Sequence, residues 1–182
     1  MIFMPDDYSA LVRKAIAGDK EAFGELYGIF LDRIYRFTYY LMRDEFAAED
    51  ATQNTFLKAW NNLQNFSPDK GTFQSYLFTI ARNLVIDSQR KKKEYSLEEG
   101  YGSDVQTGEN PEERIWQDEA KKKVHEAMDG LDGDERELVI LRFFEEMHFD
   151  EISEVVGKEP GTIRVRIHRI MQKLRTKLEG QI

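Results

Sequence analysis

Residues 149–178 read FDEISEVVGKEPGTIRVRIHRIMQKLRTKL and contain two helical patterns joined by a short turn. The apolar residues of the first pattern recur at helical spacing and predict a short helix over residues 149–156. Gly157 suits the end of that helix, and Pro160 suits the first turn of a longer basic helix that continues to about Leu178. This order of elements is typical of a helix-turn-helix, whose second helix lies in the major groove of DNA.

The longer helix of this motif has two faces of different character. At roughly 100° per residue, an apolar face holds Ile163, Ile167, Ile170, Leu174 and Leu178. The opposite ridge holds Gly161, Val165, His168, Arg169 and Gln172. Such a ridge can reach base edges while flanking cations meet phosphates, and the predicted major-groove contacts are Arg164, Val165, Arg166, His168, Arg169 and Lys173. A solvated basic helix that binds nothing is the alternative explanation.

Charge is unevenly distributed along the 182 residues, whose net charge is −8. Residues 94–119 contain nine acidic residues and one basic residue. Residues 82–93 contain five basic residues and one acidic residue, and residues 158–177 contain seven basic residues and one acidic residue. Because phosphate binding depends on local clusters, the negative net charge does not exclude a nucleic-acid-binding protein.

Helical patterns also precede the acidic stretch. Apolar residues spaced by three and four positions predict helices over residues 22–41, 45–63 and 73–90. The residues expected to face inward are, in the second of these helices, Ala48, Thr52, Phe56, Ala59 and Leu63, and in the third, Phe73, Leu77, Ile80, Ala81 and Leu84. Pro68 and Gly71 interrupt the pattern and predict a loop over residues 66–72.

The acidic stretch separates two domains. Residues 94–111 combine many acids with Gly100, Gly102, Gly108 and Pro111 and show no periodicity, so we predict a flexible linker there. The sequence therefore predicts an all-α protein of two small helical domains, residues 1–93 and 112–182. The second contains the helix-turn-helix, and Asp132 or Asp134 is expected to cap its helix that carries Leu138, Leu141 and Phe144 inward.

Several kinds of chemistry find no support in the sequence. The chain has no cysteine, and its three histidines, His125, His148 and His168, are far apart in the sequence. Acidic pairs such as Glu145–Glu146 are expected on solvated helix faces rather than in a catalytic dyad. No segment has the apolar length of a signal peptide or a membrane helix. We predict a cytoplasmic protein that is not an enzyme, binds no cofactor or metal and does not insert into a membrane.

Three stretches resemble one family. Residues 47–60 (AAEDATQNTFLKAW) and 66–92 (FSPDKGTFQSYLFTIARNLVIDSQRKK) closely resemble the promoter-melting and core-binding region of bacterial sigma factors. Residues 161–175 (GTIRVRIHRIMQKLR) resemble the end of the domain that binds the upstream promoter element. The two-domain layout looks like the extracytoplasmic-function (ECF) class. The resemblance implies a subunit that binds core RNA polymerase and promoter DNA and directs transcription initiation, with the helix-turn-helix on the −35 element.

The resemblance implies a polymerase-binding surface on the helix predicted over residues 45–63. The family pattern acid-x-x-Gln-x-x-Phe occurs here as Asp50, Gln53 and Phe56. In the family this polar surface contacts the clamp helices of the largest polymerase subunit. The same role is therefore implied for Asp50 and Gln53, with Leu57 as an apolar anchor, whereas Phe56 is expected in the core.

The resemblance further implies that the loop at residues 66–72 and the helix after it open the −10 element. Single-stranded bases need a basic groove with aromatic or polar pockets, and an extruded base must be compensated for lost stacking. The predicted single-strand contacts are Asn65, Lys70, Thr72, Tyr76, Arg82, Asn83 and Arg90. For Tyr76, packing in the core is favoured over stacking on a base.

Some alternatives stay open at this point. An anti-sigma factor, an inhibitor common among relatives, is a candidate partner. A stand-alone helix-turn-helix regulator would bind an operator as a dimer without polymerase. A sigma-like decoy would bind polymerase without starting transcription. Val165 replaces a residue that is often polar in the family, so the upstream-element preference of relatives is not expected to transfer. His148 stands where relatives often have a small capping hydroxyl, and it is expected to weaken that cap or to change how the first helix of the pair begins.

Overall fold

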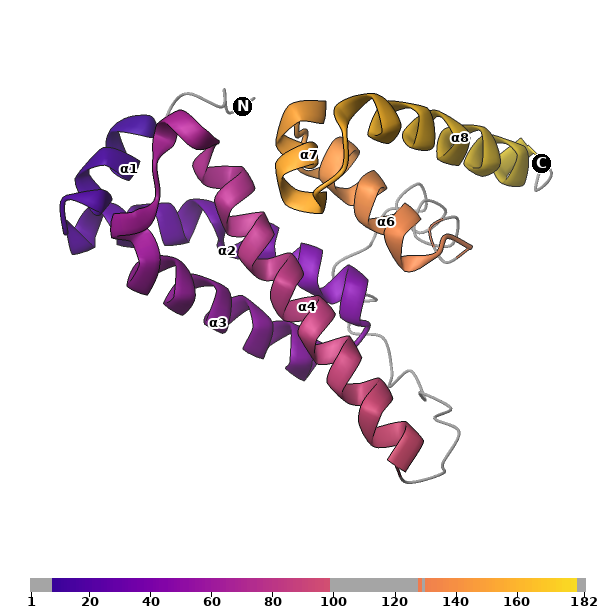
Figure 1. The fold of residues 1–182 in the computed structure, drawn as a ribbon, viewed down its shortest axis with the longest axis horizontal. Coiled ribbons are helices and arrows are strands. Elements are labelled where there is room, and N and C mark those ends of the chain that lie inside the picture. The colour runs from indigo at the N-terminus through magenta and orange to yellow at the C-terminus, as the bar shows by residue number, and fades with distance from the viewer. Residues whose placement is uncertain (1–7, 99–127, 129, 180–182) are drawn as a thin grey trace. The chain divides into compact units, whose positions relative to one another are not determined.

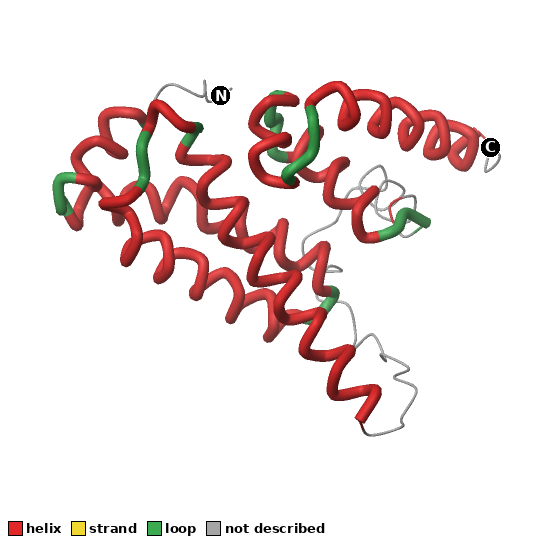
Figure 2. Tube along the Cα trace, viewed as in Figure 1, coloured by secondary structure: helices red, strands yellow, loops and turns green. Residues whose placement is uncertain are grey.

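The computed structural model describes residues 8–98, 128 and 130–179, and these residues form helices connected by turns, with no strand among them (Figures 1 and 2). The predicted all-α fold class is thereby confirmed. The chain divides into two compact units, Met1–Glu98 and Glu99–Ile182. The predicted linker lies outside the described residues from residue 99 onward, so the domain boundaries stay predictions.

The first unit is a helical bundle with α2 at its centre. Its helices are α1 (Ser9–Ile16), α2 (Lys20–Met42), α3 (Glu45–Asn62) and α4 (Phe73–Glu98). Helix α2 packs against the other three, and α3 also packs against α4. Two 3₁₀ turns, η1 (Leu63–Asn65) and η2 (Pro68–Lys70), lie between α3 and α4. No separate helix before residue 22 was predicted from the sequence.

Short polar side chains determine where these helices begin. The Oδ1 atom of Asp19 accepts hydrogen bonds from the backbone N–H groups of Glu21 and Ala22 at 3.0 and 3.1 Å. Asp44 caps α3 in the same way, accepting from Ala47 N–H at 3.1 Å. Each cap satisfies donors that the first turn of a helix leaves without a partner.

The core of the first unit confirms most of the predicted inward faces. The most deeply buried large side chains of α2 are Leu26, Phe30, Ile34 and Phe37. All five predicted inward residues of the α3 segment are buried, namely Ala48, Thr52, Phe56, Ala59 and Leu63. On α4 the prediction was correct for Phe73, Leu77 and Ala81, but Phe78 and Val85 are buried where Ile80 and Leu84 had been expected. The inner face of α4 is displaced because this helix packs against both α2 and α3.

A buried polar cluster joins α2 to α3. The hydroxyl groups of Thr38 and Thr52 lie 3.1 Å apart, and both contact the carbonyl oxygen of Ala48, at 3.2 and 2.7 Å. Both residues are almost completely inaccessible to solvent. Because buried hydroxyl groups need such partners, the cluster fixes the orientation of α3 on α2 and therefore determines which α3 residues point outward.

Replacing Thr52 tests this cluster. We expect Thr52→Val to lower the free energy of unfolding by about 1 kcal/mol, because it removes a buried hydrogen-bonding group while keeping the side-chain shape. Denaturant unfolding of the full chain, followed by circular dichroism, measures the change. Thr52→Ser keeps the hydroxyl group and is the matched control. A Val variant as stable as wild type would show that the hydroxyl pair contributes nothing.

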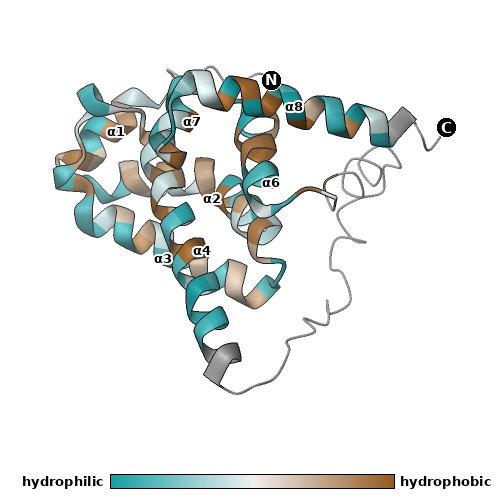
Figure 3. Cartoon of the chain, turned by 45° about the vertical axis from the view of Figure 1, so that its right-hand side comes forward, coloured by the Kyte–Doolittle hydropathy of each residue, from teal (hydrophilic) through white to brown (hydrophobic). Residues whose placement is uncertain are grey.

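The second unit contains the predicted helix-turn-helix. Its described elements are α6 (Gly133–Val139), a π-helical turn η4 (Ile140–Phe144), α7 (Phe149–Val156) and α8 (Pro160–Glu179). Helix α7 ends at Gly157, whose φ of 67° is a left-handed conformation that glycine adopts most easily. Helix α8 packs on both α6 and α7, and hydrophilic and hydrophobic residues alternate along it (Figure 3). The helix-turn-helix prediction is confirmed.

Of the two residues predicted to cap α6, Asp132 forms the cap. Its Oδ1 atom accepts from Glu135 N–H at 2.7 Å, and Glu135 Oε2 accepts in return from Asp132 N–H at 3.2 Å. This reciprocal arrangement is a capping box. The side chain of Asp134 is consequently available for other contacts.

Two further expectations were wrong in detail. Helix α4 continues to Glu98 rather than ending at Arg90, because residues 91–98 contain no glycine or proline and a change of charge alone does not end a helix. Glu145 is buried, with 3% of its surface exposed, and not solvated. The π-helical turn before it, closed by Glu145 N–H to Ile140 C=O at 3.0 Å, adds a residue to the turn and changes which side chains face inward.

Among the helices in the described ranges, none is long and apolar enough to cross a membrane.

Candidate nucleic-acid interface

Helix α8 buries one side and exposes the other, as its sequence predicts. Ile163, Ile167 and Ile170 are buried, whereas 52% of the surface of Val165 is exposed. His168, Arg169 and Gln172 are exposed along the same ridge. Leu174 is half-buried, and the side chain of Leu178 lies outside the described part of the structure. The ridge is therefore accessible to a partner as large as a DNA duplex.

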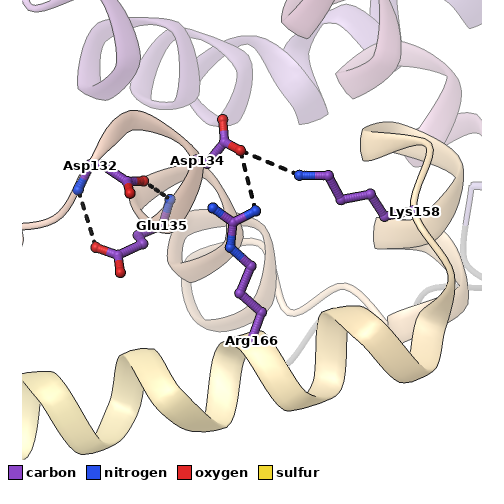
Figure 4. Close-up of polar contacts among 5 residues, drawn as sticks. All are labelled: Asp132, Asp134, Glu135, Lys158 and Arg166. Carbon is purple, nitrogen blue, oxygen red and sulfur yellow. Dashed lines mark hydrogen bonds and ion pairs between the residues drawn. The ribbon is translucent and has the colours of Figure 1, made fainter.

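Three cations, on α8 and on the turn before it, are bound by acidic residues of α6. Arg166 Nη1 lies 3.2 Å from Asp134 Oδ2, and Lys158 Nζ lies 3.3 Å from the same oxygen (Figure 4). Lys173 Nζ lies 2.7 Å from Glu135 Oε2. Of the predicted DNA contacts, Arg166 and Lys173 are thus occupied within the domain. Nothing in the α8 sequence indicated this, because the partner carboxylates lie on another helix.

Arg164 also has a partner inside the domain. Its guanidinium carbon lies 5.0 Å from the centre of the Phe149 ring, and that of Arg142 lies 4.9 Å from the same centre. Both distances suit cation–π interactions. Phe149 therefore orients Arg164 at the edge of the ridge, where the guanidinium remains exposed.

The cations around Asp134 change its acidity. Partial burial raises the pKa of the Asp134 carboxyl group, but the hydrogen bonds and positive charges of Lys158 and Arg166 together outweigh that effect. The pKa of Asp134 therefore lies below its ordinary value.

This shift predicts a pH dependence of stability. A carboxyl group whose pKa is lower in the folded state stabilises the fold fully above its unfolded pKa, about 3.9, and loses that effect as the pH falls through the folded pKa. In denaturant unfolding, we expect the stability difference between wild type and Asp134→Asn to be constant near neutral pH and to shrink below about pH 4. If the stability difference between wild type and Asp134→Asn is the same at the lowest pH as at neutral pH, the lowered pKa of Asp134 is contradicted.

A second candidate surface lies on α3. Asp50, Gln53 and Leu57 all point outward, and 59% of the surface of Leu57 is exposed. Phe56 is buried, as expected. Phe46 lies one helical turn before Asp50 on the same face and is 83% exposed, so the outward stripe contains a second large apolar residue that the sequence reading did not include.

A shallow apolar hollow adjoins this α3 stripe. It is lined by Lys20, Phe23, Phe56, Leu57 and Trp60. The rings of Phe23 and Trp60 pack with their centres 4.8 Å apart, which fixes the wall of the hollow. Leu57 thus belongs both to the exposed stripe and to the hollow.

A third candidate surface surrounds the loop between α3 and α4. Asn65, Lys70 and Thr72 are exposed, although the Thr72 hydroxyl also accepts from Ser75 N–H at 3.1 Å and so caps α4. Tyr76 is half-buried, and its hydroxyl donates to Ala59 C=O at 3.2 Å. Burial raises the pKa of the Tyr76 hydroxyl. The packing role expected for this tyrosine agrees with these contacts.

The loop forms one wall of a cavity of about 440 Å³. The opposite wall belongs to α1, which the sequence reading had not connected with this site. The cavity is lined by Tyr8, Ser9, Val12, Arg13, Phe66, Pro68, Asp69, Gly71, Thr72 and Phe73. Aromatic, hydroxyl and guanidinium groups therefore meet beside the loop.

The remaining predicted contacts follow along α4. Arg82 is half-buried and Asn83 is exposed. Arg90 is exposed and lies 3.5 Å from Asp87 and 4.0 Å from Glu94 in surface ion pairs. Exposed pairs of this kind are weak, so Arg90 can exchange its partners for a phosphate.

Each of the two units contains a segment that matches a protein-family model. The family model for Sigma-70 region 2 matches residues 26–95, and the model for Sigma-70, region 4 matches residues 121–174. Both models describe regions of one class of protein, the Sigma-70-type sigma factors. Their order along the chain is that of the first unit followed by the helix-turn-helix unit.

Individual relatives specify the class further. The chain is 31% identical over 177 residues to the ECF RNA polymerase sigma factor SigW of Bacillus subtilis (strain 168), covering 92% of this chain and 94% of that protein. It is 34% identical over 167 residues to the ECF RNA polymerase sigma factor BldN of Streptomyces coelicolor, covering 90% of this chain but only 63% of BldN. The chain belongs to the ECF RNA polymerase sigma factors.

Solved structures share the fold. CnrH, in complex with the cytosolic domain of CnrY, matches with a TM-score of 0.71 and 24% identity over 95% of this chain and 97% of CnrH. The sigma factor RpoE of Bartonella quintana, in complex with the anti-sigma factor NepR, matches with a TM-score of 0.69 and 24% identity over 86% of this chain and 96% of RpoE.

Proposed function

We propose that this sigma factor binds core RNA polymerase and directs it to promoters through three separate surfaces of its own chain. It acts in the cytoplasm and contributes no catalytic group and no cofactor, so the polymerase performs the chemistry. Residues 1–93 form the core-binding and −10 domain, and residues 112–182 form the −35 domain. Residues 94–111 connect them, beginning with the last residues of α4, which ends at Glu98. The observation that carries the proposal is the exposed ridge of α8, which opposes a buried isoleucine face.

The α8 ridge is assigned to the −35 element in the major groove. Val165, His168 and Arg169 span about 6 Å of helix axis at about 1.5 Å per residue, which confines them to one short patch of base pairs. Arg169 suits a guanine, and Val165 suits a thymine methyl group. Arg164 lies at the edge of this patch, and Arg166 and Lys173 lie farther toward the protein side.

The loop and α4 are assigned to the −10 element. The cavity beside the loop combines the aromatic and polar groups that an unstacked base requires. Thr72 lines this cavity, and Asn65 and Lys70 lie on the neighbouring turns η1 and η2. Arg82, Asn83 and Arg90 provide donors for the strand along α4. Tyr76 supports the Phe66 ring, whose centre lies 4.9 Å from its own.

The α3 stripe is assigned to the clamp helices of the largest polymerase subunit. Asp50 and Gln53 offer polar contacts, and Leu57 offers an apolar anchor next to a hollow. Protein interfaces commonly depend on such a central apolar residue with a polar surround. An anti-sigma factor is a further candidate partner, since the similar sigma factor RpoE was solved in complex with the anti-sigma factor NepR.

Run-off transcription separates this function from its alternatives. Purified core polymerase is given a fragmented-genome template with and without the full chain. New discrete start sites that depend on the chain are expected. Unchanged transcripts together with operator binding by the chain alone would favour a stand-alone regulator, and polymerase binding without new start sites would favour a decoy.

Arg169 is the residue to change on the α8 ridge. We expect Arg169→Ala to reduce discrimination for the upstream element by about 1–3 kcal/mol, because a two-pronged contact to guanine is lost. Competition binding of holoenzyme to promoters with and without that base pair measures it. Equal losses on every promoter would assign Arg169 to a phosphate instead.

Leu57 tests the polymerase surface. We expect Leu57→Asp to weaken binding to core polymerase at least about tenfold, which corresponds to about 1.4 kcal/mol. Fluorescence titration of the labelled chain with core polymerase measures the affinity. Ile86→Asp, which changes an exposed apolar residue of α4, is the matched control. If the two substitutions weaken binding equally, the assignment of Leu57 to the polymerase-binding surface is contradicted.

A further inference from the structure

Asp134 differs from the other acidic residues at the start of α6. Asp132 and Glu135 form the capping box, and Glu135 also binds Lys173. Asp134 takes no part in the cap. One of its oxygens instead binds two cations that come from the turn before α8 and from α8 itself. A single carboxylate of α6 thus binds both the turn before α8 and α8 itself (Figure 4).

The exposure of this cluster argues against a mainly structural role. The side chain of Asp134 is 57% exposed, and those of Lys158 and Arg166 are 39% and 33% exposed. Ion pairs at such exposure contribute little to stability, because water screens them. Their effect on an approaching polyanion is larger, since every phosphate that a cation neutralises releases counterions.

We infer that Asp134 masks Lys158 and Arg166 from the DNA backbone, so that binding by α8 depends on base contacts more than on sequence-independent phosphate attraction. This inference rests on the proposed function of α8. Asp134 would then set the sequence-independent affinity of α8 for DNA without touching DNA itself. Because phosphate contacts are alike on every sequence, it lowers the affinity for the correct sequence and for the others by the same factor. Removing its charge releases up to two cations to the phosphates.

The test uses holoenzyme assembled from core polymerase and the full chain. Binding is measured over a range of salt concentrations on two duplexes, one promoter found by run-off transcription and the same promoter with its upstream element scrambled. Each additional phosphate contact steepens the dependence of log affinity on log salt by about 0.9. Asp134→Asn should therefore lose roughly three- to twelvefold more affinity than wild type when salt is raised about fourfold. Its preference for the intact over the scrambled element should stay that of wild type, because the released cations meet phosphates on both duplexes.

Three variants make the outcome specific. Asp132→Asn removes the same charge two residues away while keeping a good capping residue, and it should retain the wild-type salt dependence. Asp134→Glu keeps the carboxylate and should restore most of the masking. In Asp134→Asn combined with Arg166→Gln, the extra salt dependence should fall by about half, because one of the two released cations is gone.

Failure of the inference can be told from failure of the proposed function. If wild-type holoenzyme does not distinguish the two duplexes, the function assigned to α8 is wrong. If it does distinguish them, and folded Asp134→Asn shows the wild-type salt slope, the masking role is overturned. Circular dichroism and thermal melting confirm that the variants are folded. An equal change in Asp132→Asn would also overturn the inference, since it would reflect general charge rather than this contact.

Discussion

The burial of three isoleucines on one side of α8 is the constraint on which the interpretation of the second unit depends. Ile163, Ile167 and Ile170 are held against α6 and α7, so the helical period leaves the side chains halfway around the helix in solvent. The choice of outward residues is therefore made by core packing. A change in register of the isoleucines would rotate Arg169 and His168 away from the ridge together.

The polar residues around this helix perform separate tasks. Asp132 satisfies backbone donors at the start of α6, Glu135 completes that cap and binds Lys173, and Asp134 binds Lys158 and Arg166. Phe149 orients Arg164 without any charge. Of the predicted DNA contacts on α8, three have partners within the domain, whereas Val165, His168 and Arg169 lie on the open ridge. This division follows from the structure and supports assigning base reading to the ridge.

Features that depend on local periodicity could be predicted from the sequence. The isoleucine face, the α3 core residues and the Gly157–Pro160 turn follow from spacing and from the conformational preferences of glycine and proline. Features that join distant segments could not. Asp134 meets residues 24 and 32 positions later, and the cavity wall formed by α1 faces a loop far along the chain. The burial of Glu145 could not be predicted, because a π-helical turn has no clear sequence signal and changes which side chains face inward.

One small contact in the first unit has a mechanical consequence. The Tyr76 hydroxyl, at the beginning of α4, is hydrogen-bonded to the Ala59 carbonyl, near the end of α3. The helix assigned to polymerase binding and the loop assigned to the single-stranded −10 element are therefore held in a fixed position relative to each other. When the polymerase binds α3, the loop is held at a fixed distance from that interface. The distance between the polymerase and the first unpaired base would then be set by the sigma factor and would not vary from one promoter to the next.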